Sequence, residues 1–170
     1  MDKRILILGV GNILYSDEGL GVHAVNYLQE HYRFSPNVTL LDGGTLGKLL
    51  MNVLIEHDFV IVLDAVIGGE APGTLYRLTD GALRKSLGFR DSQHDVDLVD
   101  TLISCEIVGN RPEAVVIGME PADWRTMSLE LTPVCAEKLP KMIDHALEEL
   151  EAAGEKYSAI LTVSLNDTHC

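Results

Sequence analysis

Cysteine, basic residues and aromatic residues are all scarce in this 170-residue chain, and each scarcity excludes a class of protein. The three cysteines form no CxxC pair, which argues against a disulfide scaffold or a zinc ribbon. Thirteen Lys and Arg stand against 26 Asp and Glu, a net charge of −13, so the chain lacks the cations that bind nucleic-acid phosphates or anionic membranes. Aromatic residues make up 5% and include a single tryptophan, too few for a platform on which bases stack.

Long apolar runs are missing as well. No stretch reaches the roughly 18 apolar residues that a membrane span needs. The apolar run at residues 5–11 is short, has no small-residue cleavage site after it, and gives way to acidic residues, which is unlike a signal peptide. The scattered cysteines are expected to be reduced thiols. These features predict a soluble cytoplasmic protein without a nucleic-acid or membrane partner, and nothing in the sequence requires more than a monomer.

The order of apolar runs and helical stripes predicts an α/β fold. Continuous apolar runs are typical of strands covered on both faces, and they occur at residues 4–10, 38–41, 59–66 and 114–118. Helical periodicity occurs at residues 19–32, 46–54, 96–104 and 133–153. Alternating strands and helices indicate right-handed crossovers and a parallel sheet with helices on both faces, and residues 74–78 are expected to add a short edge strand. We expect one domain over residues 1–153, followed by a tail of unassigned role, residues 154–170, that is either appended or frayed.

The chemistry-bearing residues follow the ends of the predicted strands. Ligands of open α/β sheets bind outside the carboxyl ends of the strands. The residues at or after these ends in the sequence include Glu18, Asp42, Asp64 and His94. Asp64 interrupts an apolar run, where a carboxylate is costly unless it is paired, hydrogen-bonded or bound to a metal. Two carboxylates and one imidazole, from Glu18, Asp64 and His94, suit a borderline divalent ion such as Ni, Fe, Mn or Zn.

Asp42, Asp64, His94 and the residues next to Glu18 also have a purely structural interpretation. Asp64 at a strand end can cap the following loop, and Asp42 before two glycines can be a turn residue. Ser16 or Asp17 can cap the helix that begins near residue 19, where the helix dipole favours negative charge. His94 alone can be an exposed loop histidine.

Two glycines after the first strand raise the alternative of nucleotide binding. Gly9-Val10-Gly11 follows a strand and precedes a helix, but the third glycine of a dinucleotide motif is replaced by Leu14. The acidic residues that follow would repel a pyrophosphate. No GxxxxGK[ST] loop and no GxSxG elbow is present. We therefore expect no nucleotide or organic cofactor, and titration with nucleotides is the check on the nucleotide-binding alternative.

Five sequence blocks together resemble the maturation endopeptidases of [NiFe] hydrogenases. They are GVGNILYSDEGLGV at 9–22, DGGT at 42–45, IVLDA at 61–65, APGT at 71–74 and SQH at 92–94. The resemblance extends over about residues 3–150. It implies a three-layer α/β/α sandwich around a twisted, mostly parallel five-stranded sheet with one antiparallel strand. It also implies an endopeptidase that cleaves a short C-terminal extension from the hydrogenase large-subunit precursor once nickel is inserted.

The same resemblance assigns roles to individual residues. The nickel-contacting glutamate, aspartate and histidine of the family fall on Glu18, Asp64 and His94. The nickel is expected to be supplied by the precursor, which holds it through its own cysteines, and Asp42 is the candidate for an assisting general base. The alternative function is a non-catalytic nickel-binding protein that escorts the precursor.

Overall fold

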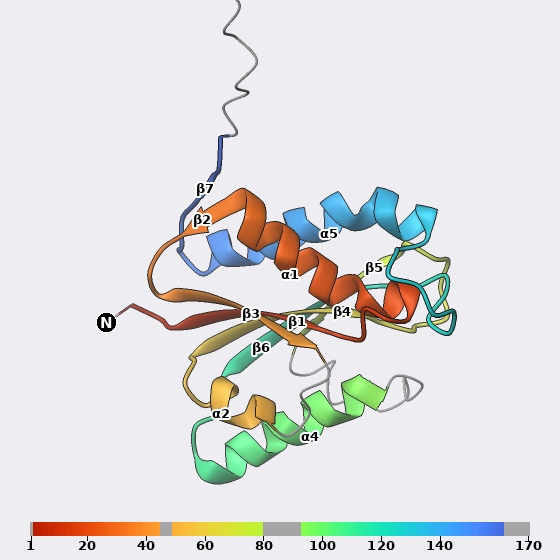
Figure 1. Ribbon diagram of the computed structural model, residues 1–170. Coiled ribbons are helices and arrows are strands. Elements are labelled where there is room, and N and C mark those ends of the chain that lie inside the picture. The colour runs from red at the N-terminus through yellow and green to blue at the C-terminus, as the bar shows by residue number, and fades with distance from the viewer. Residues whose placement is uncertain (1, 45–48, 80–92, 162–170) are drawn as a thin grey trace, which may run out of the picture.

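A five-stranded sheet between two layers of helices forms the body of the protein. The computed structural model describes residues 2–44, 49–79 and 93–161, with residues 93–100 described as backbone. Helices α1 and α5 cover one face of the sheet, and α2 and α4 cover the other (Figure 1). This arrangement confirms the predicted three-layer α/β/α sandwich. Among the described residues, no helix combines the length and the apolarity that crossing a membrane requires.

The strands and helices have the following bounds. The main sheet consists of β1 (Ile5–Val10), β3 (Val38–Gly44), β4 (Phe59–Ala65), β5 (Leu75–Thr79) and β6 (Glu113–Met119). The helices are η1 (Ser16–Gly19), α1 (Leu20–His31), α2 (Leu50–Leu54), α4 (Gln93–Val108) and α5 (Pro133–Ala152). Two further strands, β2 (Tyr32–Phe34) and β7 (Tyr157–Ala159), pair with each other outside the main sheet.

The strand order β3-β1-β4-β6-β5 determines where a ligand can bind. The pairs β1–β3, β1–β4 and β4–β6 are parallel, whereas β5 pairs with β6 in the antiparallel direction at the edge, as the resemblance implied. The chain leaves β1 toward β3 and later returns to place β4 on the other side of β1. The sheet therefore has a topological switch point between β1 and β4, and in open α/β sheets ligands bind at the carboxyl ends beside such a point.

Burial on both faces explains why the strands are continuous apolar runs. Every residue of β1 and of β4 is buried. Ile5 and Ile7 of β1 belong to the core under α1 and α5, and Leu6 and Leu8 belong to the core under α2 and α4. Because successive strand residues point to opposite faces, one strand supplies both cores. Each fully buried aliphatic side chain contributes about 1.5–3 kcal/mol of transfer free energy.

Three segments differ from the sequence expectations. The helix expected at residues 46–54 is described only as the single turn α2, with Leu49 exposed beside it, and residues 45–48 lie outside the described part. Helix α4 is longer than the expected 96–104, and His94 lies in its first turn rather than in a loop. Part of the expected tail pairs with the domain, because β7 forms an antiparallel ladder with β2, while residues 162–170 lie outside the described part.

Helix α1 and the central strands approach each other so closely that only glycine fits between them. A Cβ atom on Gly21 would lie 1.9 Å from the carbonyl oxygen of Leu63 and 2.5 Å from that of Val10. A Cβ atom on Gly9 would lie 2.3 Å from the carbonyl oxygen of Gly21. These glycines therefore have a packing role, which accounts for the Gly9-Val10-Gly11 sequence without a nucleotide.

We predict that Gly21→Ala lowers the free energy of unfolding by about 3 kcal/mol, because the added methyl group overlaps backbone atoms that cannot move aside. Alanine forms helices better than glycine, so any loss must come from the overlap. Urea unfolding followed by circular dichroism measures the change.

Gly69→Ala is the matched control, because Gly69 has φ 79° and a Cβ there meets no atom within 4 Å. It is expected to cost only about 1 kcal/mol, the price of a left-handed backbone conformation. An equal loss in both variants would contradict the close approach of α1 to the sheet.

Candidate functional site at the carboxyl ends of β1 and β4

Two of the predicted ligands, Glu18 and Asp64, flank the switch point of the sheet. Glu18 lies in η1, one helical turn before Gly21, which contacts the carbonyl oxygen of Leu63. Asp64 is the residue after Leu63 on β4. The loop after β1 also folds back on η1, since a Cβ atom on Gly11 (φ 123°) would lie 1.9 Å from the carbonyl oxygen of Glu18. The backbone that carries Glu18 is thus held against the strand end that carries Asp64.

Asp64 lies inside the sheet rather than on a solvated loop. Its residue is 3% exposed, and its strand neighbours on both sides are apolar and buried. It pairs in register with Gly118 of β6. A carboxylate at such a position requires compensating partners, which agrees with the sequence argument that singled it out.

Asp42 lies exposed near the end of β3, at the same end of the sheet. Its Oδ1 atom accepts a hydrogen bond of 2.9 Å from the backbone N–H of Gly44, which has φ 47°. This is the turn interaction that the sequence offered as the structural interpretation of Asp42. The second carboxylate oxygen has no hydrogen bond to any residue in the described part of the chain. Its role as a general base stays a prediction.

His94 is placed at this end of the molecule by the topology of α4. The strand after α4 runs parallel to β4, so α4 runs in the opposite direction and begins at the carboxyl ends of the strands (Figure 1). The side chain of His94 lies outside the described part. Among the side chains that are described, no group of three His, Cys, Asp or Glu residues is arranged to hold a metal ion, so the predicted ligand set is not tested.

Asp17 has a role that differs from the helix cap considered in the sequence analysis. Neither η1 nor α1 has a side-chain cap. The fully buried carboxylate of Asp17 instead accepts hydrogen bonds from the backbone N–H groups of Ala122, Asp123 and Thr132 and from the hydroxyl of Thr132, at 2.7 to 3.1 Å. Burial raises the pKa of Asp17, but the hydrogen bonds led by Thr132 outweigh it, and the net pKa lies below the usual 3.8.

Glu120 is a second buried acid, and sequence reasoning missed it. It is 5% exposed and directly follows β6. Its Oε2 atom accepts hydrogen bonds from Gly68 N–H (2.7 Å) and the Tyr76 hydroxyl (2.9 Å), and its Oε1 atom accepts one from Gly69 N–H (3.1 Å). Burial and the hydrogen bond to Glu120 raise the pKa of Tyr76 to about 12. Glu120 thereby holds the loop that follows β4. The signal was available in the sequence, since Glu120 directly follows an apolar run.

The cysteines do not supply a nucleophile in the described part of the chain. Cys105 and Cys135 are fully buried, as expected for small core residues. Burial raises the pKa of the Cys135 thiol to about 11, which keeps it protonated at neutral pH. Cys170 lies outside the described part.

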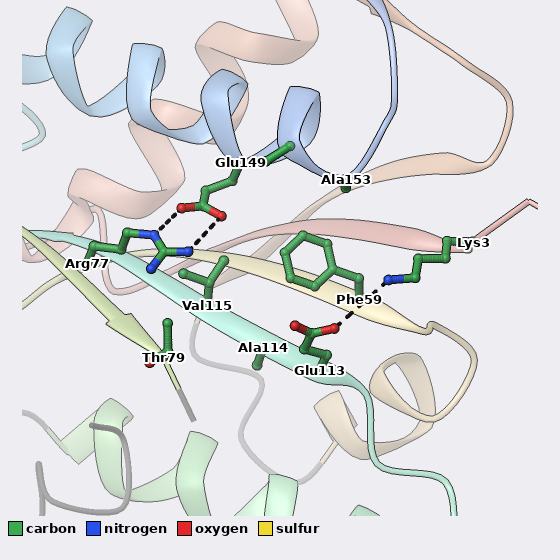
Figure 2. Close-up of a pocket in the computed structure, with 10 residues that line it drawn as sticks. Lys3, Phe59, Arg77, Thr79, Glu113, Ala114, Val115, Glu149 and Ala153 are labelled. Atoms are coloured by element: carbon green, nitrogen blue, oxygen red, sulfur yellow. Dashed lines mark hydrogen bonds and ion pairs between the residues drawn. The ribbon is translucent and has the colours of Figure 1, made fainter. Parts of the chain in front are cut away.

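A pocket of about 360 Å³ lies at the other end of the sheet and is separate from these acids. Its lining residues include Lys3, Phe59 and Glu113, which lie at the amino ends of β1, β4 and β6 (Figure 2). Its charges are paired within the pocket, Arg77 with Glu149 and Lys3 with Glu113. Because the acids of interest lie at the carboxyl ends, we place the candidate site there.

The fold and these side chains define the class of the protein. It is an α/β/α protein in which Glu18 and Asp64 lie at the carboxyl ends of the two strands that flank the switch point. A family model described as HycI, hydrogenase maturation protease, matches residues 22–149. The chain belongs to the hydrogenase maturation protease family, which confirms the resemblance found in the sequence.

Individual relatives agree with this assignment. The chain is 38% identical over 155 residues to the hydrogenase expression/formation protein HupD of Thiocapsa roseopersicina, covering 90% of this chain and 70% of the relative. It is 36% identical over 152 residues to the hydrogenase 2 maturation protease of Escherichia coli, covering 88% and 90%. Among solved structures, the hydrogenase maturating endopeptidase HybD from E. coli superposes with a TM-score of 0.87 at 32% identity, covering 92% of this chain and 97% of that one.

We predict that Asp17→Asn lowers the free energy of unfolding at pH 7 by about 2–4 kcal/mol, because the amide nitrogen turns one acceptor into a donor that faces backbone N–H groups. The folded-state pKa of Asp17 is depressed. Its ionised form therefore stabilises the fold above the unfolded pKa, and this stabilisation is lost as the pH falls through the folded pKa. Urea unfolding between pH 6 and 2.5 should show a shallower acid loss for the variant.

Asp144→Asn, on the exposed face of α5, is the control and should stay within about 0.5 kcal/mol of wild type. A parallel pH dependence of wild type and Asp17→Asn would show that Asp17 does not carry this part of the acid sensitivity.

Proposed function

We propose that this chain is an endopeptidase that removes the C-terminal extension of a nickel-loaded [NiFe] hydrogenase large-subunit precursor, and that it recognises the nickel. Family membership supports the reaction class, and relatives carry the names hydrogenase 2 maturation protease and hydrogenase maturating endopeptidase. At the level of residues, the proposal rests on the contact of Gly21 with Leu63, which holds Glu18 beside the strand end that bears Asp64.

The chemistry of the donors fits a divalent ion that arrives with the substrate. Two carboxylates and one imidazole, from Glu18, Asp64 and His94, offer oxygen and nitrogen ligands of the kind that nickel accepts. They would complete the coordination of an ion that the precursor already holds. An ion beside the scissile peptide polarises its carbonyl group or lowers the pKa of a water. Asp42, exposed at the same end of the sheet, is the proposed assisting base for that water.

Nickel recognition follows from the charge of the site. A nickel-free precursor brings no cation for the carboxylates of Glu18 and Asp64 to attract. Such a precursor therefore binds weakly at this end of the sheet. With the cation present, the same carboxylates favour the complex. The metal thereby distinguishes a loaded precursor from an empty one.

We predict that the purified chain shortens the nickel-loaded precursor and leaves the nickel-free precursor at full length. Mass spectrometry of the precursor after incubation measures the loss of the extension. Cleavage of both forms at the same rate would disprove nickel recognition while leaving the endopeptidase activity in place. Binding of the loaded precursor without any mass loss would instead establish the escort function.

We predict that Asp64→Asn lowers the processing rate at least about 100-fold, because removal of a charged ligand takes away several kcal/mol of transition-state stabilisation at little change in volume. His94→Ala is expected to cause a loss of the same order. Circular dichroism and thermal unfolding establish that each variant is folded.

The matched control for this experiment is Asp58→Asn. Asp58 is an exposed aspartate just before the other end of β4, where it pairs with Arg4. The Asp58→Asn variant should process the precursor at the wild-type rate. Should Asp64→Asn prove unfolded, Glu18→Gln, on the half-buried η1 residue, tests the same ligand set. A folded Asp64 variant with wild-type activity would refute the metal role.

A further inference from the structure

Residues 127–129, called here the edge segment, form a short strand-like contact with the loop after β1. Ser128 makes an isolated parallel bridge with Tyr15. Its N–H donates to the Leu14 carbonyl at 2.9 Å, and its carbonyl accepts from Ser16 N–H at 2.8 Å. Ser16 adopts φ 50°, a conformation that non-glycine residues rarely adopt, and its hydroxyl donates to the Glu130 carbonyl at 3.0 Å. The two segments are thus locked together.

The edge segment leaves backbone groups available on its other side. Ser128 directs its own N–H and carbonyl group toward residues 14–16, so those of its neighbours lie on the opposite side, as in any strand. Within the described part of the chain, the N–H groups of Met127 and Leu129 have no hydrogen-bond partner. An open strand edge of this kind is where an extended peptide adds to a protein.

Exposed apolar side chains surround the same edge. Met127 is 74% exposed, Leu129 is 61% exposed, and Leu14 on the bridged loop is 50% exposed. Met127 and Leu129 are the two neighbours of Ser128, so both exposed side chains lie beside the bridge. Apolar side chains that cluster on a surface mark interaction sites, whereas scattered ones need no explanation.

The edge segment is continuous with the candidate site. Tyr15, its bridge partner, accepts a hydrogen bond of 3.1 Å from the backbone N–H of Glu18. The Asp17 carboxylate, between the bridge and Glu18, holds the rest of the 120–132 loop. A peptide bound on the open side of the edge segment therefore runs alongside the loop that carries Tyr15 and Glu18, with the edge segment between them. Other exposed apolar side chains, such as Ile107 and Val108, lie at the far end of α4.

We propose that the edge segment and Leu14 bind the precursor segment that carries the scissile bond, as an extended peptide with apolar side chains. This inference rests on the proposed function and names the surface that positions the substrate. Apolar contacts with Leu14, Met127 and Leu129 provide affinity, and the open backbone groups align the peptide. The acidic residues at the carboxyl ends of the strands then act on the scissile bond.

The test is steady-state processing of the nickel-loaded precursor by Met127→Ser/Leu129→Ser. We expect KM to rise about tenfold, because two apolar anchors lose contacts worth about 1.4 kcal/mol together. The value of kcat is expected to stay within about twofold, because the acids are untouched. Leu14→Ser, on the other segment, should raise KM in the same direction. Both variants change exposed side chains, and their unfolding midpoints should equal that of wild type.

The matched control is Ile107→Ser/Val108→Ser, which removes two equally exposed apolar side chains far from the edge segment and should leave KM unchanged. Unchanged KM in both edge variants, or an equal rise in the control, would overturn this inference while wild-type cleavage still upholds the proposed function. A wild-type dimer in sedimentation velocity that the edge variants dissociate would overturn it too, because a second copy would then occupy the edge. If the wild-type protein leaves the nickel-loaded precursor intact, the proposed function is wrong, and this inference is then wrong as well.

Discussion

The buried carboxylate of Asp17 ties together three parts of the protein. Its four hydrogen bonds join η1, which follows β1, to the loop after β6 and to Thr132 at the start of α5. Hydrogen bonds to a charged acceptor are worth about 1.5–3 kcal/mol each, which offsets the cost of burying the charge. The position of Glu18, one residue further on, follows from this arrangement, and so does the bridge between Tyr15 and Ser128.

Two of the acids at this end of the sheet, Asp17 and Glu120, have hydrogen-bond partners that account for their burial. Asp17 accepts four hydrogen bonds and Glu120 accepts three, mostly from backbone N–H groups, so the fold itself accounts for both. Asp42 accepts one from Gly44 and is otherwise exposed. Each saturated acid fixes a loop beside the candidate site, Asp17 the 120–132 loop and Glu120 the loop after Asp64. The structural acids thus position the surroundings of the proposed catalytic ones.

The sequence could predict features whose residues lie close together along the chain, and it could not predict features that depend on distant partners. The strands were predictable because burial on both faces demands continuous apolar runs, and Asp64 was conspicuous as the charge that interrupts one. Glu120 obeys the same rule and was within reach. The role of Asp17 was not, because its partners lie 105 to 115 residues away. The β2–β7 ladder was also hidden, since three-residue strands that pair through the backbone leave no periodic pattern. Of the helix predicted at 46–54, α2 confirms residues 50–54, whereas residues 46–48 lie outside the described part; the exposed Leu49 does not fit the predicted apolar stripe.

The layered architecture provides a place at this end of the sheet for the proposed recognition of a metal-loaded substrate. Glu18 comes from the segment that leads into α1, on one face, Asp64 comes from the sheet itself, and the helix that carries His94 covers the other face (Figure 1). Ligands from three layers can converge only at the strand ends, beyond the last packed side chains, where a substrate also has access. In the proposed function the carboxylates at this end of the sheet attract the cation that the precursor carries. That cation is what a nickel-free precursor does not offer, so in the proposed function its attraction to the carboxylates favours a precursor that carries its metal.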